Sequence, residues 1–279
     1  MNLSEQLLAN EGMLRMSFFL GVLALMALLE ALLPRRRRQI PRVIRWSNNF
    51  ALVVLDSMLL KLCFPLLAVA MAALAVENQW GLFNLIEVPL LVAVFVSIVL
   101  LDLAIYLQHV LFHMVPPLWR LHRVHHTDLD FDVTTGIRFH PIEILLSMGI
   151  KLLLVILLGP PVVAVLIFEV ILNASAMFNH SNLKLPLALD SLLRRIVVTP
   201  DMHRVHHSVI VKETNSNYGF FLPWWDQLFG TYIDQPENGH EGMTIGISEF
   251  RAREEARLDK MLLQPLKSGS TPTQGETYD

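Results

Sequence analysis

The stretch IEILLSMGIKLLLVILLGPPVVAVLIFEVILNASAMF (142–178) decides the fold, because it is long and apolar but interrupted near its middle. The interruption is Gly159-Pro160-Pro161. A helix does not continue through two prolines, since two backbone donors are lost and each ring clashes with the preceding turn. The pattern therefore predicts two short apolar helices that fold back on each other. Such a hairpin need not cross a bilayer completely.

Each arm of this hairpin carries one charged residue. Lys151 and Glu169 each lie nine residues from Pro160, on opposite arms. A charge at membrane depth is costly unless it is paired or in contact with water. We therefore expect the hairpin to bring the two side chains together as an ion pair. The alternative is that each side chain extends independently to the membrane surface.

The composition of the whole chain also indicates a membrane protein. Of its 279 residues, 53% are hydrophobic and only 17% are charged, whereas a soluble domain carries about a quarter charged residues. Three more apolar stretches precede the hairpin, at Met16–Leu33, Phe50–Val76 and Val88–Leu101, and the last continues as a helical pattern to His113. The prediction is an all-α integral membrane protein with three to four spans plus the hairpin. A net charge of −3 gives no basis for nucleic acid binding.

Basic residues predict the orientation of the spans. The segment PRRRRQIPRVIR (34–45) has six arginines, whereas ENQWGLFNLIE (77–87) has no Lys or Arg. The positive-inside rule then places 34–45 in the cytoplasm and makes the third span run inward. Segments 109–141 and 179–279 are consequently cytoplasmic. Together they hold all eleven histidines, so a cytosolic helical cap is expected to carry the histidine clusters.

The histidines recur at helical spacing. His109 and His113 form H-x-x-x-H, and the sequence His-Arg-Val-His-His occurs twice, at 122–126 and 203–207. Spacings of three and four place side chains on one face of a helix, where imidazoles can share a metal. His140 and His180 flank the two ends of the hairpin, and only His240 stands apart. Ten imidazoles shared between two ions give about five each, which leaves one position open on a six-coordinate iron.

Histidines that bind a metal need hydrogen-bond acceptors for their second nitrogen. Several polar residues near the clusters are candidates, namely Asp102, Asp128, Asp130, Asp132, Glu143, Asp201 and Asn217. A solvated loop or a helix cap explains most of them equally well. Asp102 differs, because it shares a helix face with His109 and His113 at the membrane end of the third span. Asp102, Asp128 and Asn217 are the three that we retain as expected partners.

Seven motifs occur in one order along about 50–235. They are D-x6-H-x-x-x-H (102–113), LHRVHHTD (121–128), TTGIRFHP-x-E (134–143), FNHSN (178–182), TPDMHRVHHS (199–208), NYGF (217–220) and WWDQLFGTY (224–232). In these motifs the chain resembles the fatty acid hydroxylase / sterol desaturase superfamily of integral-membrane di-iron oxygenases. The sequences of the motifs are most similar to those of bacterial-type members.

The resemblance implies two iron ions and O2-dependent attack on a C–H bond of a membrane lipid, which could be a fatty acyl, sterol or isoprenoid chain. The implied ligands, which are also the catalytic residues, are His109, His113, His122, His125, His126, His203, His206 and His207. His140 and His180 match the family's intervening histidines and complete the expected ligand set. The implied location is a bacterial inner membrane, with the active site on the cytoplasmic side. Electrons are expected from a separate reductase, ferredoxin or haem protein.

Two other functions compete with lipid hydroxylation. The first is lipid desaturation on the same scaffold, which differs only by fine geometry at the metal. The second is a membrane metal-binding protein that holds zinc and has no oxygenase activity. The sequence does not identify the lipid or the oligomeric state.

The sequence also suggests a division of the chain into three parts. Residues 1–48 form an N-terminal span with the basic loop, 49–235 form the di-iron membrane domain, and 236–279 form a cytosolic end. Within this end, ISEFRAREEARLDKMLLQPL (247–266) has interleaved charges typical of an amphipathic helix. The polar sequence from 267 to 279 is expected to be disordered.

Overall fold

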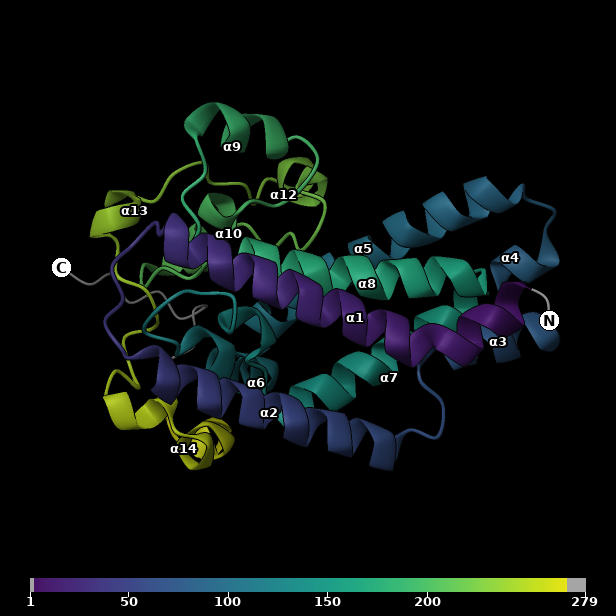
Figure 1. Cartoon of the computed structure of the whole chain (residues 1–279), viewed down its shortest axis with the longest axis horizontal. Coiled ribbons are helices and arrows are strands. Elements are labelled where there is room, and N and C mark those ends of the chain that lie inside the picture. Colours follow the sequence, from purple (N-terminus) through teal and green to yellow (C-terminus); the bar gives the residue numbers. More distant parts are fainter. Residues whose placement is uncertain (1–2, 270–279) are drawn as a thin grey trace.

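The computed structural model describes residues 3–269, and their regular structure is helical (Figure 1). The long helices are α1 (Leu3–Leu32), α2 (Arg42–Cys63), α5 (Leu90–Met114), α7 (Pro141–Leu158) and α8 (Val162–Asn179). Shorter ones are α3 (Ala68–Glu77), α4 (Leu82–Leu85), α6 (Pro116–His126), α9 (Leu187–Leu193), α10 (Pro200–His206), α11 (Val211–Thr214), α12 (Trp224–Phe229), α13 (Gly239–Gly242) and α14 (Leu258–Leu263). Within 3–269, β pairing is limited to two isolated bridges.

Five helical segments are long and apolar enough to cross a membrane within the described range. They are α1, the segment that begins with α2, α5, and the two hairpin arms α7 and α8. The prediction of an all-α membrane protein with three to four spans and a hairpin is therefore confirmed. In Figure 1 these helices run along the long axis of the molecule, and the short helices α6, α9, α10, α12 and α13 gather at one end.

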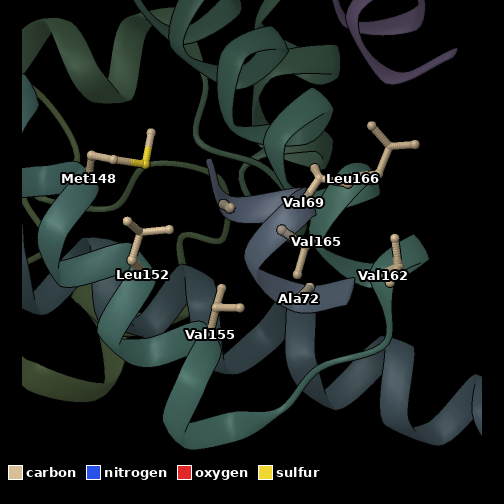
Figure 2. Packing of buried hydrophobic residues seen from close by; sticks show 9 residues of the cluster. Val69, Ala72, Met148, Leu152, Val155, Val162, Val165 and Leu166 are labelled. Atoms are coloured by element: carbon tan, nitrogen blue, oxygen red, sulfur yellow. The ribbon is translucent and has the colours of Figure 1, made fainter. Parts of the chain in front are cut away.

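The second apolar stretch, predicted at 50–76, consists of two helices rather than one. Helix α2 ends at Cys63, and α3 begins only at Ala68. Pro65 lies in the break, where it removes a backbone donor that a continuous helix would need. Helix α3 then packs between the arms of the hairpin, where Val69 and Ala72 contact residues of α7 and α8 (Figure 2). The small alanine side chains of α3 allow this close approach.

The turn of the hairpin depends on two glycines. Gly159 ends α7 in the left-handed conformation, with φ of 59°, which glycine adopts at little cost. Gly81 precedes α4, has φ of 86°, and lies directly against Gly159. A methyl group at Gly81 would overlap the backbone nitrogen of Gly159. The turn therefore needs glycine on both sides of this contact.

Gly81→Ala is expected to lower the free energy of unfolding by about 2 kcal/mol, because it adds both a positive-φ penalty and a backbone clash. The measurement is thermal unfolding in a fixed detergent. Gly21→Ala is the matched control, since a methyl group at Gly21 meets no atom within 4 Å. Equal stability of the two variants would show that the contact between the turns is dispensable.

The ion pair predicted within the hairpin is present. Lys151 Nζ lies 2.9 Å from Glu169 Oε1, so the prediction is confirmed. Arg15 of α1 adds a second cation, with its Nη1 atom 3.1 Å from Glu169 Oε2. Glu169 is only 2% exposed. One carboxylate therefore joins three membrane-length helices and is paired with two cations, of which Arg15 also lies 3.9 Å from Glu11.

The arginine-rich loop between α1 and α2 lies at the same end of the molecule as α10 and α13 (Figure 1). The backbone of Arg35 donates to the Asn182 carbonyl at 2.9 Å, and its side chain pairs with Asp201 at 3.2 Å. Glu30, at the end of α1, accepts from the backbone nitrogens of Val133 and Asn182. These contacts hold the arginine-rich loop against the segments on either side of the hairpin, as expected if all of them lie on the same side of the membrane. The side of the membrane on which this end lies stays a prediction.

The segment 247–266 is not the single amphipathic helix that its charge pattern predicted. It forms a 3-10 turn (Arg253–Ala256), the short helix α14, and a second 3-10 turn (Gln264–Leu266). Pro265 prevents α14 from continuing as a regular helix. Met261 is fully buried against Leu52 of α2 and Val124 of α6, so this segment covers the histidine end of the bundle. Residues 270–279 of the expected disordered tail lie outside the described residues. The three-part division at 48 and 235 stays a prediction.

Candidate metal centre

Nine of the ten predicted ligands converge into two buried groups. The first group is His109, His113, His122, His126 and His206, and the second is His125, His180, His203 and His207. Within each group, one ring nitrogen of every histidine lies within 4.8 Å of the others. All nine side chains are buried. The prediction left open how the histidines divide, and the structure divides them five and four.

The sequence His-Arg-Val-His-His, each copy of which we call a word, occurs at 122–126 and again at 203–207. The first word gives two histidines to the first group and one to the second, and the second word does the reverse. In the first word, His122 and His126 are four residues apart and join the first group, whereas His125 joins the second. In the second word, His203 and His207 are four apart and join the second group, whereas His206 joins the first. The repetition therefore has a geometric reason, because each short helix supplies an i, i+4 pair to one group and a single imidazole to the other.

Distances between the imidazoles test whether a metal fits. His109 Nε2 and His122 Nε2 are 3.1 Å apart in the first group, and His125 Nε2 and His180 Nε2 are 3.0 Å apart in the second. Nitrogens bound to one metal at about 2.1 Å lie roughly 3.0 Å apart when the bonds are at right angles, and roughly 3.4 Å apart in a tetrahedron. The observed spacing of these pairs is therefore compatible with two imidazoles that share one metal ion.

Four of the histidines have acceptors that fix the tautomer. Nδ1 of His109 donates to the Tyr218 carbonyl at 2.8 Å, and Nδ1 of His206 donates to the Ser216 carbonyl at 2.7 Å. His180 donates in the same way to the Ala176 carbonyl at 2.8 Å. When Nδ1 carries the proton, the lone pair of Nε2 is free for a metal. The backbone therefore prepares these imidazoles for coordination.

His122 has a stronger acceptor. Its Nδ1 atom donates to Glu143 Oε1 at 2.6 Å, and both side chains are buried. A carboxylate in this position raises the basicity of the imidazole and fixes its orientation. The sequence presented Glu143 only as one of several acids near the clusters. Its position three residues after His140, in the first turn of α7, was the available signal.

Two of the three expected partners of the ligands lie elsewhere. Asp102 accepts from the Leu222 backbone at 3.2 Å and from Trp225 Nε1 at 2.8 Å, so it joins α5 to α12. Asp128 binds Arg45. Within residues 3–269, neither carboxylate contacts a histidine of the two groups through a hydrogen bond. The roles expected for Asp102 and Asp128 as direct acceptors are therefore not what the geometry shows.

Asn217 influences His206 and His109 indirectly, through the backbone carbonyls of its two neighbours in the chain. It lies between Ser216 and Tyr218, whose carbonyls accept from His206 and His109. Its backbone has a positive φ of 48°, and its amide donates to the carbonyls of Met202 and Ile233. Asparagine tolerates this backbone conformation better than most residues. Asn217 therefore fixes the turn that aims both carbonyls.

His140 is the one predicted ligand that the structure does not bring to either group. It caps the first turn of α7, where Nδ1 accepts from the Ile142 backbone at 3.2 Å. Nε2 lies 3.3 Å from the Leu262 carbonyl. Both ring nitrogens are therefore directed to backbone groups rather than to the other imidazoles. Its place before Pro141, at the start of a helix, accounts for the residue without a metal.

Burial keeps the ligand histidines neutral. Desolvation lowers the pKa of His122 to about 3 and the pKa of His180 to about 3, because a buried imidazolium loses its hydration. Neighbouring imidazoles lower the pKa of His125 and His207 further. At neutral pH these side chains can therefore bind a cation without first releasing a proton.

The arginines inside the two words hold neighbouring segments. Arg123 is buried, donates to the carbonyls of Gln264 at 2.5 Å and Lys267 at 2.6 Å, and lies over the Phe250 ring. Arg204 pairs with Asp201 and donates to the Ser181 carbonyl at 3.2 Å. The guanidinium groups therefore point away from the imidazoles and tie each word to a different part of the chain.

One cavity of about 280 Å³ reaches the two histidine groups from between the membrane-length helices. His109, His122 and His125 line it, and so do Lys151 and Glu169 of the hairpin. Glu143 and Lys151 are eight residues apart on α7, which corresponds to roughly 12 Å along the helix axis. The cavity therefore extends from the histidines into the part of the bundle that is long enough to lie in a membrane.

His240 lies outside both groups, as expected, and offers a pH test at the edge of the site. Burial lowers its pKa to about 4, although nearby Asp201 raises it. Between pH 6.5 and pH 4 the unfolded chain binds a proton here and the native chain does not, so native stability falls as the pH falls.

We expect the wild-type protein to lose about 1 kcal/mol more than His240→Gln between pH 7.5 and pH 5, a figure reduced for solvent screening. The measurement is chemical unfolding of both proteins at the two pH values. Identical losses in the two proteins would show that His240 does not contribute to acid sensitivity.

The fold and these two groups define a class, a helical membrane protein whose buried imidazoles are suited to metal binding. The chain belongs to the fatty acid hydroxylase family, whose model matches residues 94–231. That segment holds every histidine of the two groups.

Several characterised proteins are similar to the chain. The ornithine lipid hydroxylase OlsE of Rhizobium tropici is 30% identical over 227 residues, which are 78% of this chain and 66% of that protein. The alkylglycerol monooxygenases of Xenopus tropicalis and Homo sapiens are 31% and 29% identical over 53% of this chain and 32% of their own length. The match thus spans just under two thirds of the first relative and about a third of the others. No solved structure matches the chain significantly.

Proposed function

We propose that the protein is an oxidoreductase that hydroxylates a membrane lipid with O2 at a pair of iron ions. The observation that carries the proposal is the meeting of two histidine groups with one cavity between membrane-length helices. A lipid chain can reach such a cavity from the bilayer, and the imidazoles lie in its wall. The names of the relatives, which are lipid hydroxylases and monooxygenases, support the same reaction class.

The chain's own residues have three tasks in this reaction. The nine histidines would hold two irons, which supply the activation of O2 when bound. Glu143 and the carbonyls of Ser216, Tyr218 and Ala176 orient four of those histidines. The walls of the cavity position the lipid and exclude water from the reacting carbon. If each iron took six ligands, the five and four imidazoles would leave positions free for O2.

The proposal includes two features outside the chain. Hydroxylation with O2 consumes two electrons, and we assign their delivery to a separate reductase, ferredoxin or haem protein. We also assign the active site to the cytoplasmic side of the membrane, which is supported by the contact of Arg35 in the arginine-rich loop with Asp201 near the histidines and by the positive-inside rule. For a bacterial host this is the inner membrane.

Lipid extracts test the proposed function. Cells that express the chain should contain a lipid 16 mass units heavier than its counterpart in cells without it. Cells that express His206→Ala at the same level should lack the heavier lipid. A loss of two mass units would indicate desaturation instead. Zinc in the purified protein, with unchanged lipids, would contradict the proposal in favour of a metal-binding role.

A further inference from the structure

Asp56 of α2 is an acid at membrane depth that the metal centre does not explain. It is 7% exposed, and its Oδ1 atom is buried without a hydrogen-bond partner. Among residues 3–269, no cation forms an ion pair with it. An unpaired carboxylate in a membrane-length helix is costly, and it marks a functional site more often than not. Asp56 lines the cavity that reaches the histidines.

Two more acceptor atoms in the same cavity lack donors. Gln108 donates through Nε2 to Ser147 Oγ at 2.8 Å, and this bond leaves its Oε1 atom buried without a partner. Glu143 uses Oε1 for His122, and its Oε2 atom is buried without a partner. Helices α2, α5 and α7 thus each contribute one oxygen without a hydrogen-bond donor to the wall of the same cavity. Within the described part of the chain, no side chain that lines the cavity supplies the missing donors.

Water can satisfy these oxygens while the cavity is empty of lipid. A plain hydrocarbon chain that displaced the water would leave all three acceptors unmet. Each unmet buried acceptor weakens binding by roughly tenfold or more. A ligand that brings its own N–H or O–H donors avoids this loss. The cavity therefore discriminates against an unfunctionalised stretch of chain.

The far end of the cavity has the opposite character. There the carboxylate of Glu169 is already paired with two cations, because Oε1 lies 2.9 Å from Lys151 Nζ and Oε2, which has no hydrogen-bond partner, lies 3.1 Å from Arg15 Nη1. Asp56 and Glu143 line the same cavity without any such cation among the described residues, and Glu143 contacts the ligand His122. A donor group is therefore favoured at the histidine end and not at the deep end.

We propose that Asp56 selects the substrate, by accepting a hydrogen bond from an amino or hydroxyl group of the lipid close to the metal pair. The oxidised carbon then lies a few bonds from that polar group, rather than in the middle of a hydrocarbon chain. The proposal rests on the proposed function in taking this cavity as the substrate site. It assigns Asp56 a role in specificity and none in metal binding.

Three probes with the same number of heavy atoms test this assignment without measuring turnover. They are 1-octylamine, 1-octanol and heptyl methyl ether, of which only the ether has no donor. Isothermal titration of iron-loaded full-length protein in phosphatidylcholine nanodiscs gives the affinities, with empty nanodiscs as the blank. We expect the ether to bind at least about tenfold more weakly than the better of the other two. Which of these two binds better identifies the donor as an amine or a hydroxyl.

Asp56→Leu should remove this preference while two metals remain bound. Asp56→Asn keeps a carbonyl acceptor and should retain the preference for octanol over the ether. Glu87→Leu is the matched control, because Glu87 is an exposed acid outside the cavity, and it should behave as the wild type. Equal binding of the three probes to the wild type, or an unchanged preference in Asp56→Leu, would overturn the proposal. A preserved preference in a protein that oxidises no lipid would instead count against the proposed function alone.

Discussion

His203→Ala is expected to reduce bound metal from two ions per chain to about one, and to reduce lipid oxidation at least a hundredfold. His203 belongs to the group of four, in which its Nε2 atom lies 3.1 Å from His180 Nε2. Removing even a hydrogen-bond partner of a ligand costs about 10- to 100-fold in affinity or activity, so loss of the ligand itself should cost more. The measurements are metal analysis of gently purified protein and the yield of oxidised lipid.

His140→Ala is the matched control for this experiment. It also removes one buried histidine from the same end of the molecule, but His140 faces backbone groups rather than the other imidazoles. We expect two metals and activity within a few-fold of the wild type. Loss of metal in His140→Ala, or two metals in His203→Ala, would contradict the division of the ligands into five and four.

Arg45→Met is expected to destabilise the protein by about 3–5 kcal/mol, which is the usual cost of removing one partner of a buried ion pair. Arg45 is fully buried at the start of α2 and binds Asp128 through two bonds of 2.7 and 2.6 Å. Its third contact is with Asp132 at 2.5 Å. Without the guanidinium, two buried carboxylates remain close together. Thermal unfolding of the metal-loaded protein measures the loss.

Arg38→Met provides the comparison for Arg45. Arg38 belongs to the same arginine-rich segment (34–45) but lies before α2 and is exposed, so its removal should change stability by less than about 0.5 kcal/mol. Similar losses in both variants would mean that the buried pair adds little beyond surface charge. The comparison also distinguishes two roles of arginine in this segment. Arg45 stabilises the fold from inside the molecule, whereas the exposed Arg38 can contribute to the orientation of the protein in the membrane.

The sequence predicted the histidines well because their signal is local. His122, His125 and His126 lie within two turns of one helix, and spacing alone places them on neighbouring faces. How they divide between two groups is not local, because it depends on the angle at which α6 meets α5 and α10. The contribution of each word to both groups therefore could be seen only once the helices were placed.

The errors have similar physical causes. A histidine before a proline at the start of a helix has the same sequence whether it binds a metal or caps the helix, so His140 was indistinguishable from a ligand. The break between α2 and α3 cannot be seen in the hydropathy, because the residues around Pro65 are as apolar as those of a continuous span. Glu143 was one acid among several until α7 brought it to His122.

The cavity and the metal ligands come from different parts of the chain. All nine converging histidines lie within 94–231, the segment shared with the family. Arg15, Phe19 and Asp56, which help to line the cavity, lie before that segment. If the proposed function holds, the metal ligands therefore come from the segment that matches the family, whereas part of the lipid-binding cavity comes from the two helices that precede it. Two relatives with identical ligands can consequently oxidise different lipids, and residues on α1 and α2 are the positions to compare between them.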